Sequence, residues 1–280
     1  MSEIRIDALL PQEMATRAEY IGARKAEMSS LTTFSLAILA GAFIALGAVF
    51  ATTVAAGTSG VLPFGVAKLL TGLVFCLGLI LVVVGGAELF TGNNLIVMAW
   101  ASGKVTGRAL LRNWLIVYLG NFVGSFGTAI LVMLSQQYTF GGGAVGETAL
   151  KIAVGKVNLG FGQAIALGVL CNALVCLAVW LTFSARSTID KIAAIIFPIT
   201  AFVAAGFEHS VANMYFIPFG LLIKDFDPAF VADKAINASS LTWGSFLVNN
   251  LLPVTIGNII GGAVLVAAIY WSIFLRRRED

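Results

Sequence analysis

Long apolar runs, separated by short polar stretches, make up most of the chain. A helix needs about 20 apolar residues to cross a bilayer, and six runs are long enough. The predicted spans are about 31–54, a span that begins near Pro63, then 112–135, 160–183, 191–223 and 247–274. Glycines interrupt the second span at about 85–94 and the fifth at about 206–210. Backbone leaves the helix at membrane depth only where protein or a water-lined cavity covers it. The pattern therefore predicts an all-α membrane protein in which helices 2 and 5 are broken.

A short polar pattern occurs once in each interrupted span. Residues 86–93 and 206–213 both read G-x-E-x-x-x-[GA]-N, and residues 113–124 and 250–261 both read N-x-L-x-V-x-x-G-N-x-x-G. Each repeated unit thus holds three spans, and an odd number turns the second unit upside down relative to the first. We predict an inverted 3+3 repeat whose broken helices meet near the midplane, with their positive helix starts directed at one point.

The composition agrees with a membrane protein. Hydrophobic residues make up 59% of the chain and charged residues 11%, whereas a soluble domain has about 25% charged residues. The net charge of only +3 argues against a nucleic-acid partner. The three cysteines lie in apolar runs, and the sequence has no CxxC, HExxH or P-loop motif. We therefore expect no metal ion and no cofactor.

Lys and Arg residues are unevenly divided between the two sides of the predicted bundle. Twelve lie on the side of both termini and five on the other, so the positive-inside rule places both termini in the cytoplasm. We expect residues 1–280 to form one transmembrane domain. Residues 1–30 would form a helical segment at the membrane surface, beginning at Pro11, and a cytoplasmic partner would bind there. Residues 31–274 would form the six-span bundle, and 275–280 a cytoplasmic tail.

Ionisable and amide side chains inside the predicted spans have two interpretations. His209, the only histidine, lies at the second break, where an intramembrane ionisable group is more typical of a substrate path than of packing. Glu88 and Glu208 occupy equivalent positions, either as proton or cation sites or as acceptors for unpaired N–H groups where helices restart. Their symmetry favours the structural role. Asn93 and Asn213 pose the same choice, with interhelical hydrogen bonding as the default.

Apolar side chains flank the predicted breaks, and no Lys or Arg lies in the middle of a span. The flanking residues are Phe75, Leu79, Leu89, Phe90 and Phe202. An apolar constriction is typical of gating by dewetting, although each residue alone also fits ordinary core or lipid contact. The glycine pairs Gly120 with Gly124 and Gly257 with Gly261 indicate close helix contacts rather than ligand sites.

The runs GAELFTGNNLIV at 86–97, GFEHSVANMYFIPFG at 206–220 and PVTIGNIIGG at 253–262 together resemble the formate/nitrite transporter family. The similarity covers essentially the whole chain, including 63–84 and 112–121. It implies an aquaporin-like homo-pentamer in the bacterial inner membrane, with one pore per protomer for formate and similar small monovalent anions.

The resemblance also implies roles for particular residues. The family's central histidine falls on His209 and its threonine partner, on a mobile loop, falls on Thr91. The asparagine near the histidine falls on Asn172, and the lysine that attracts anions falls on Lys156. The apolar constrictions fall on the same five residues that flank the breaks.

Together these observations predict a passive or pH-gated anion channel in which His209, oriented by Asn172 and Thr91, shares or lends a proton at the constriction. Proton transfer from an ordinary histidine to an Asp-like acid is uphill by roughly 3.5 kcal/mol. That is comparable with the several kcal/mol needed to desolvate an ion. The sequence leaves open whether formate, nitrite, hydrosulfide, acetate or lactate is preferred.

Three alternatives have to be weighed against a channel. A proton-coupled formate/nitrite secondary transporter would use the same inverted repeat and broken helices. A neutral-solute pore of aquaporin type is disfavoured because the sequence has no Asn-Pro-Ala motif. An intramembrane enzyme using His209 with Glu208 is disfavoured because adjacent helical residues diverge by about 100°. We therefore expect no enzymatic activity.

Overall fold

The computed structural model describes residues 8–276, and this part of the chain is helical without β-strands. Five of its helices are long and apolar enough to cross a membrane. They are α2 (Ser30–Ala55), α3 (Phe64–Gly85), α5 (Gly107–Leu134), α7 (Phe161–Ser184) and the continuous helix Ser245–Phe274. Residues 1–7 and 277–280 lie outside the described part of the chain. Three of the basic residues that were counted to predict the orientation, Arg5, Arg277 and Arg278, therefore lie outside it as well.

The last long helix is not uniform. It consists of η3 (Ser245–Leu251), α11 (Leu252–Ile259), η4 (Ile260–Ala268) and α12 (Ile269–Phe274), of which η3 and η4 are π-helical. Its counterpart in the sequence repeat, α5, is α-helical throughout. π-helical turns are rare and often lie near functional sites.

Two apolar stretches of the sequence form shorter helices. After α3 the chain is not helical until η1 (Gly92–Ile96), which leads into α4 (Val97–Ala101). Similarly, α8 (Thr188–Ala204) and α9 (Ser210–Phe226) are separated by residues 205–209. Gly86 and Gly206, with φ of 76° and 74°, follow the ends of α3 and α8. Glycine adopts this left-handed conformation without strain, so the chain can leave the helix at both places.

Polar side chains define where several helices begin. The hydroxyl of Ser29 accepts the Thr32 N–H at the start of α2, and that of Thr106 accepts the Ala109 N–H at the start of α5. Ser187 caps α8 by accepting the Asp190 N–H. These caps satisfy N–H groups that have no partner within the helix.

The helices pack as two similar groups. Helix α2 packs against α3 and α5, and α7 packs against α8 and the last long helix. Glycines allow the closest approaches: a Cβ on Gly124 would lie 1.9 Å from the Ile38 carbonyl oxygen, and one on Gly261 would lie 2.2 Å from the Val169 carbonyl oxygen. The predicted use of these glycine spacings for helix contact is therefore confirmed.

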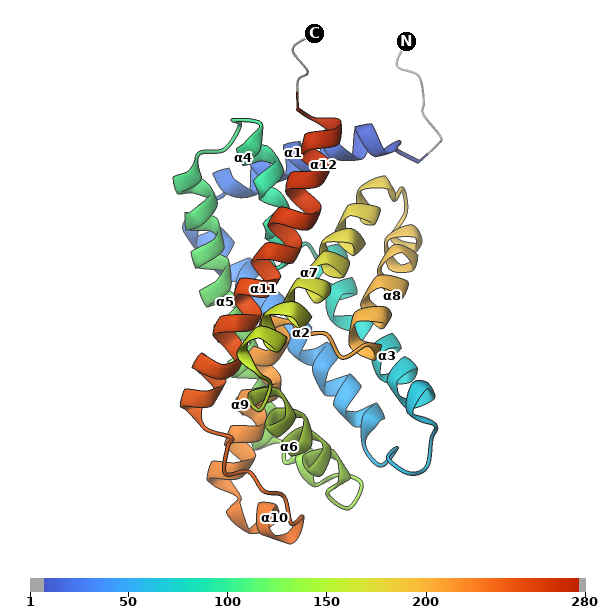
Figure 1. Ribbon diagram of the computed structural model, residues 1–280, viewed down its shortest axis with the longest axis vertical. Coiled ribbons are helices and arrows are strands. Elements are labelled where there is room, and N and C mark those ends of the chain that lie inside the picture. The colour runs from blue at the N-terminus through green and yellow to red at the C-terminus, as the bar shows by residue number, and fades with distance from the viewer. Residues whose placement is uncertain (1–7, 277–280) are drawn as a thin grey trace.

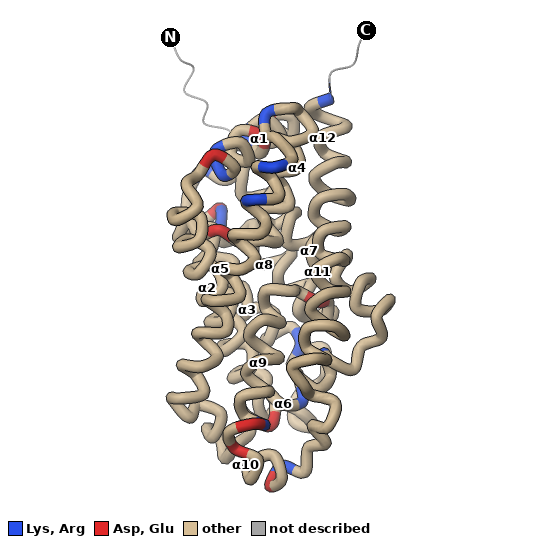
Figure 2. Tube along the Cα trace, turned by 90° about the vertical axis from the view of Figure 1, so that its left-hand side faces the viewer, with Lys and Arg blue, Asp and Glu red and all other residues tan. Residues whose placement is uncertain are grey.

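Short helices cover the two ends of the elongated bundle (Figure 1). At one end lies α1 (Pro11–Glu27), which begins at the predicted proline and packs against η1, α4 and α12. At the other end lie η2 (Gln137–Thr139), α6 (Ala144–Val157) and α10 (Pro228–Asp233). Figure 2 shows Lys and Arg gathered around α1 and α4, and fewer charged residues along the middle of the bundle. Helix α1 is no loose surface helix, because Met14, Ala15 and Ala18 are buried.

Candidate functional site

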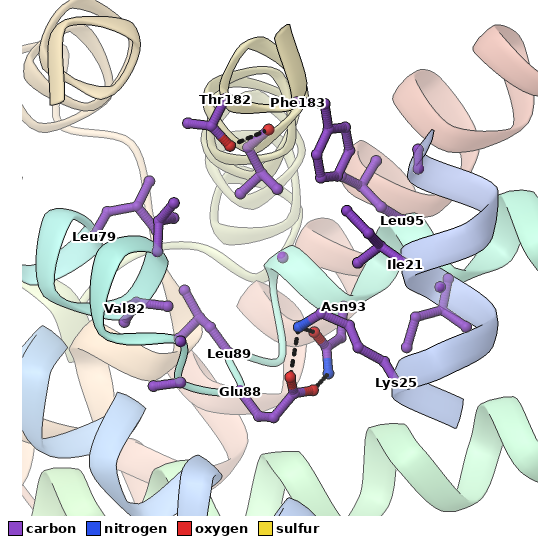
Figure 3. A pocket seen from close by; sticks show the side chains of 18 of the residues that line it. Ile21, Lys25, Leu79, Val82, Glu88, Leu89, Asn93, Leu95, Thr182 and Phe183 are labelled. Carbon is purple, nitrogen blue, oxygen red and sulfur yellow. Dashed lines mark hydrogen bonds and ion pairs between the residues drawn. The ribbon is translucent and has the colours of Figure 1, made fainter. Parts of the chain in front are cut away.

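Two cavities reach toward the non-helical segments from opposite ends. The cavity beside α1, here the α1-side cavity, has a volume of about 250 Å³ and is lined by Lys25, Glu88 and Asn93 (Figure 3). The cavity beside α6, here the α6-side cavity, has a volume of about 680 Å³ and is lined by Lys156 and His209, among others. Each cavity is therefore lined by a lysine, an asparagine and a glutamate.

Four of the five predicted constriction residues line these cavities. Leu79 and Leu89 line the α1-side cavity, and Phe75 and Phe202 line the α6-side cavity. All four side chains are at most 4% exposed. Phe90 lines neither cavity, since its ring packs edge-on against Tyr118 and Trp114 at 4.9 and 6.0 Å between centroids.

The structure brings Thr91 and His209 together across 118 positions of sequence. The Thr91 hydroxyl oxygen lies 2.9 Å from His209 Nε2. The other ring nitrogen, Nδ1, accepts the Ala212 backbone N–H at 3.0 Å. The imidazole stacks on Phe202, with 5.9 Å between ring centroids, and Phe202 in turn meets Phe75 edge-on at 5.6 Å. Both polar side chains are buried, Thr91 completely.

Asn172 contacts the threonine side of this pair. Its Nδ2 donates to the Thr91 carbonyl oxygen at 3.3 Å and to the Asn258 carbonyl oxygen at 2.7 Å. The Cys176 thiol donates to the same Thr91 carbonyl at 3.3 Å. Among the hydrogen bonds of the described residues, none joins Asn172 to His209. An orienting effect of Asn172 on His209, as the sequence predicts, would therefore have to act through Thr91.

The α6-side cavity contains a buried ion pair with two amides. Lys156 Nζ donates to Glu208 Oε1 at 2.7 Å, and Asn213 Nδ2 donates to Glu208 Oε2 at 2.6 Å. The same Asn213 amide donates to Asn250 Oδ1 at 2.7 Å, and Asn250 Nδ2 donates to the Lys156 carbonyl oxygen at 3.0 Å. The side chains form a closed ring of polar contacts, which stabilises charge inside an apolar bundle.

The α1-side cavity repeats these four hydrogen bonds, and Figure 3 shows the part formed by Lys25, Glu88 and Asn93. Lys25 Nζ donates to Glu88 Oε1 at 2.6 Å, and Asn93 Nδ2 donates to Glu88 Oε2 at 2.7 Å. Asn93 also donates to Asn113 Oδ1 at 2.9 Å, and Asn113 Nδ2 donates to the Lys25 carbonyl oxygen at 3.3 Å. Lys25 is thus the counterpart of Lys156.

Lys25 was not among the sequence candidates, and the structure identifies it as part of the repeated arrangement. Glu88 N donates to the Leu36 carbonyl and Glu208 N to the Leu167 carbonyl. Lys25 precedes Leu36 by the same interval that separates Lys156 from Leu167. The structural correspondence therefore starts before the first long helix and makes α1 and α6 equivalent.

Two further asparagines hold the non-helical segments in place. Asn121 Oδ1 accepts the Phe90 N–H, and its Nδ2 donates to the carbonyls of Ala37 and Glu88. Asn258 does the same for the Ser210 N–H and for the carbonyls of Gly168 and Glu208. The glutamates were expected to accept such backbone N–H groups. The structure instead gives that task to the asparagines and pairs the glutamates with lysine and amide side chains.

Further charged groups line the α6-side cavity. Lys68, Lys151 and Glu147 line it. Lys151 donates to the Glu147 carboxylate at 2.5 Å, and this hydrogen bond lowers the pKa of Glu147 below its ordinary value. The excess of lysine favours the approach of anions over cations.

Comparisons with known proteins give one consistent result. The sequence model described as "Formate/nitrite transporter" matches residues 12–272. The chain is 50% identical over 277 residues to the formate channel FocA of Escherichia coli K12, covering 98% of this chain and 97% of that one. It is 42% identical to the formate channel FocA of Haemophilus influenzae, covering 92% of each chain. The fold is similar to a solved "Pentameric formate channel with formate bound", with a TM-score of 0.82 and 47% identity, covering 88% of this chain and 98% of that one.

Proposed function

The chain belongs to the formate/nitrite transporter family, and from this premise we propose that it is a channel through which formate and similar small monovalent anions pass. The relatives compared above are named as formate channels, not as enzymes. The two cavities, which approach each other from opposite ends and carry lysine near their depth, support this function.

The proposed architecture is one transmembrane domain over residues 1–280. In it, α3 with η1 and α4 forms a broken second span, and α8 with α9 forms a broken fifth span. The chain would then have six spans in an inverted 3+3 repeat of aquaporin-like form. The matching contacts of Lys25 with Glu88 and of Lys156 with Glu208 support the repeat. We further propose a homo-pentamer in the bacterial inner membrane, with both termini in the cytoplasm.

The pore would run between the two cavities past Thr91 and His209. Lys25 and Lys156 would raise the local anion concentration at either end. Phe75, Phe202, Leu79 and Leu89 would form two apolar constrictions, with Phe90 supporting them from behind. A bare ion entering such a constriction loses several kcal/mol of hydration. The observation that supports the proposal most directly is the 2.9 Å contact between Thr91 and His209, a polar pair that would lie between the two constrictions.

We expect His209 to share or lend a proton to the anion, which makes transport sensitive to pH. The test is formate flux in proteoliposomes over a range of pH, for the wild type and His209→Asn. Flux through the wild type should change as the pH falls, and the variant should lose that change. An unchanged pH dependence in the variant would remove His209 from the mechanism.

A proton-coupled secondary transporter is the second candidate. It is favoured by the closed section between the cavities: Thr91 is fully buried and lines neither of them, as expected where access alternates. Accumulation of formate against its gradient when a proton gradient is imposed would establish this alternative. Flux that only follows the formate gradient would establish the channel.

The first helix is the proposed site for a cytoplasmic partner. Helix α1 is buried on one side and presents Tyr20, 63% exposed, on the other. Retention of a soluble protein by the wild type and its loss from Tyr20→Ala would support this role.

A further inference from the structure

We infer that His209 caps helix α9 through Nδ1, which fixes the neutral imidazole with its hydrogen on Nε2 and leaves the Thr91 hydroxyl hydrogen as the donor available to an anion. The link to the anion rests on the proposed function, but the capping role does not. His209 is then both a positioning residue for Thr91 and a structural part of α9.

The capping role follows from the backbone. Helix α9 begins at Ser210, and His209 precedes it with an extended conformation, φ −113° and ψ 113°, as N-cap residues have. Its Nδ1 lies 3.0 Å from the Ala212 nitrogen. A backbone N–H can only donate, so Nδ1 must be the acceptor and carries no hydrogen. A neutral imidazole has one N–H, which therefore lies on Nε2.

The direction of the next hydrogen bond is fixed by this tautomer. The Nε2–H group donates to the Thr91 hydroxyl oxygen at 2.9 Å, so the hydroxyl acts as an acceptor there. Its own hydrogen has no acceptor among the described residues. The Asn172 amide and the Cys176 thiol hold the Thr91 carbonyl from the opposite side. Thr91 is thus a fixed hydroxyl donor whose hydrogen bond to an anion would be charge-assisted and strong.

A proton on Nδ1 would oppose this arrangement. It would place two donors face to face across the 3.0 Å between Nδ1 and the Ala212 nitrogen, and α9 would lose its cap. The charged side chains that line the same cavity are Lys68, Glu147, Lys151, Lys156 and Glu208. Of these, Lys156 and Glu208 neutralise each other in an ion pair, as do Lys151 and Glu147.

A single histidine makes the tautomer directly measurable. The protein is labelled with ¹³C and ¹⁵N histidine, reconstituted in liposomes at neutral pH, and examined by solid-state NMR. Correlations from each ring nitrogen to its adjacent carbons assign Nδ1 and Nε2 without other signals. The expected spectrum has an unprotonated Nδ1 and a protonated Nε2. A protonated Nδ1, in a neutral or a cationic ring, would overturn the inference.

A pair of substitutions separates the two ring nitrogens. Asparagine is a good N-cap and places an oxygen close to the Nδ1 position, whereas glutamine reaches toward the Nε2 position without capping. We expect His209→Asn to denature close to the wild-type temperature in detergent and His209→Gln to denature at a clearly lower one. Equal denaturation temperatures for the two variants would contradict the capping role. Neither result depends on formate, so a wild type without formate flux would overturn the proposed function alone.

Discussion

The two repeated segments of this protein, 86–93 and 206–213, each contain a helix break and the start of the next helix, and they share a scaffold but not the residues at its centre. In each, a glycine with positive φ precedes a glutamate bonded to a lysine, and an asparagine from the long helix that follows in the repeat holds the backbone. The central positions differ completely. Leu89, Phe90 and Thr91 lie where the second segment has His209, Ser210 and Val211. We call the lysine–glutamate pairs and the backbone-holding Asn121 and Asn258 the frame, because they are the same in both halves. The three central side chains differ, and this difference creates the contact between Thr91 and His209.

The frame itself differs in one detail. Lys25 Nζ also contacts Asn93 Oδ1 at 3.0 Å, and its side chain is 27% exposed. The Lys156 side chain is 16% exposed and bonds to Glu208, while Asn213 Oδ1 has no partner among the described residues. Lys25, which lies on α1, therefore has two acceptors, Glu88 Oε1 and Asn93 Oδ1. Its counterpart Lys156 is more deeply buried, bonds to one acceptor, the Glu208 carboxylate, and lies over the Phe216 ring, 5.5 Å from its centroid.

The largest expected effect comes from removing either glutamate. Glu208→Ala leaves the Lys156 ammonium without its carboxylate inside the bundle and removes one acceptor from Asn213, and breaking a buried ion pair costs about 3–5 kcal/mol. Glu88→Ala should cost less, because the more exposed Lys25 can still reach water. Thermal unfolding of both variants in detergent measures the difference, with Glu→Gln at each position as the matched control. A greater loss from Glu88→Ala than from Glu208→Ala would refute this ranking.

The next effect tests the asparagines that hold the backbone. Asn121→Leu and Asn258→Leu each leave one N–H and two carbonyl groups without their partner. Each unpaired buried group costs about 1–3 kcal/mol. The two variants should be destabilised equally, because their contacts are the same in both halves. Unequal unfolding temperatures of the two variants would show that equivalent hydrogen bonds do not contribute equally to stability in the two halves.

A smaller effect on stability is expected at the asymmetric centre. Thr91→Val gives the first segment the residue of the second and removes one hydroxyl, so the Nε2–H group of His209 loses its acceptor. The expected loss is about 1 kcal/mol, and Thr91→Ser should restore most of it. Thermal unfolding of the two variants checks this, and a loss as large as that of Glu208→Ala would place Thr91 in the frame rather than at the centre.

The smallest effect concerns the helices that lead into the two segments. Helix α8 begins with a capping box in which the Asp190 carboxylate accepts the N–H groups of Ser187 and Arg186, whereas α3 has no side-chain cap. These hydrogen bonds lower the pKa of Asp190, and the bond from the Ser187 N–H has the largest effect. The stabilisation is therefore complete above the unfolded pKa of about 3.9 and lost as the pH falls through the lower folded pKa.

Asp190→Asn should accordingly unfold at a slightly lower temperature than the wild type at pH 7. The difference should vanish at a pH below the folded pKa of Asp190. Unfolding curves at both pH values measure this difference in unfolding temperature. A difference that persists in acid would mean that it does not arise from the charge of the Asp190 carboxylate.

Much of this organisation could be predicted from the sequence, because membrane physics limits the choices. Apolar runs gave four of the long helices almost to the residue, and the Gly-Glu-Asn pattern located both non-helical segments. The placement of Lys25 could not be predicted by the same reasoning, because α1 was expected on the membrane surface and polar sequence carries no signal for its buried face. The bonds of Asn121 and Asn258 to distant carbonyls also depend on tertiary packing.

The candidate site was predicted unevenly for a similar reason. His209 stood out because a lone histidine in an apolar run is conspicuous, and Thr91 was known only through the family resemblance. Asn172 bonds to the Thr91 carbonyl and not to the imidazole. This choice depends on how α7 packs against η1, and neither residue spacing nor composition encodes that packing. The sequence did not predict that Phe90 packs against Tyr118. It shows that an aromatic residue lies beside a helix break, but not whether its ring faces a cavity or the neighbouring helix.

The most direct test of the central claim is formate flux through purified protein in liposomes, compared for the wild type, Thr91→Val and Thr91→Ser. A hydrogen bond to a charged group is worth about 1.5–3 kcal/mol, which corresponds to roughly 10- to 100-fold in rate. The account predicts downhill formate flux in the wild type, a loss of that size in the folded valine variant, and recovery in the serine variant. Undiminished flux through the valine variant would contradict it.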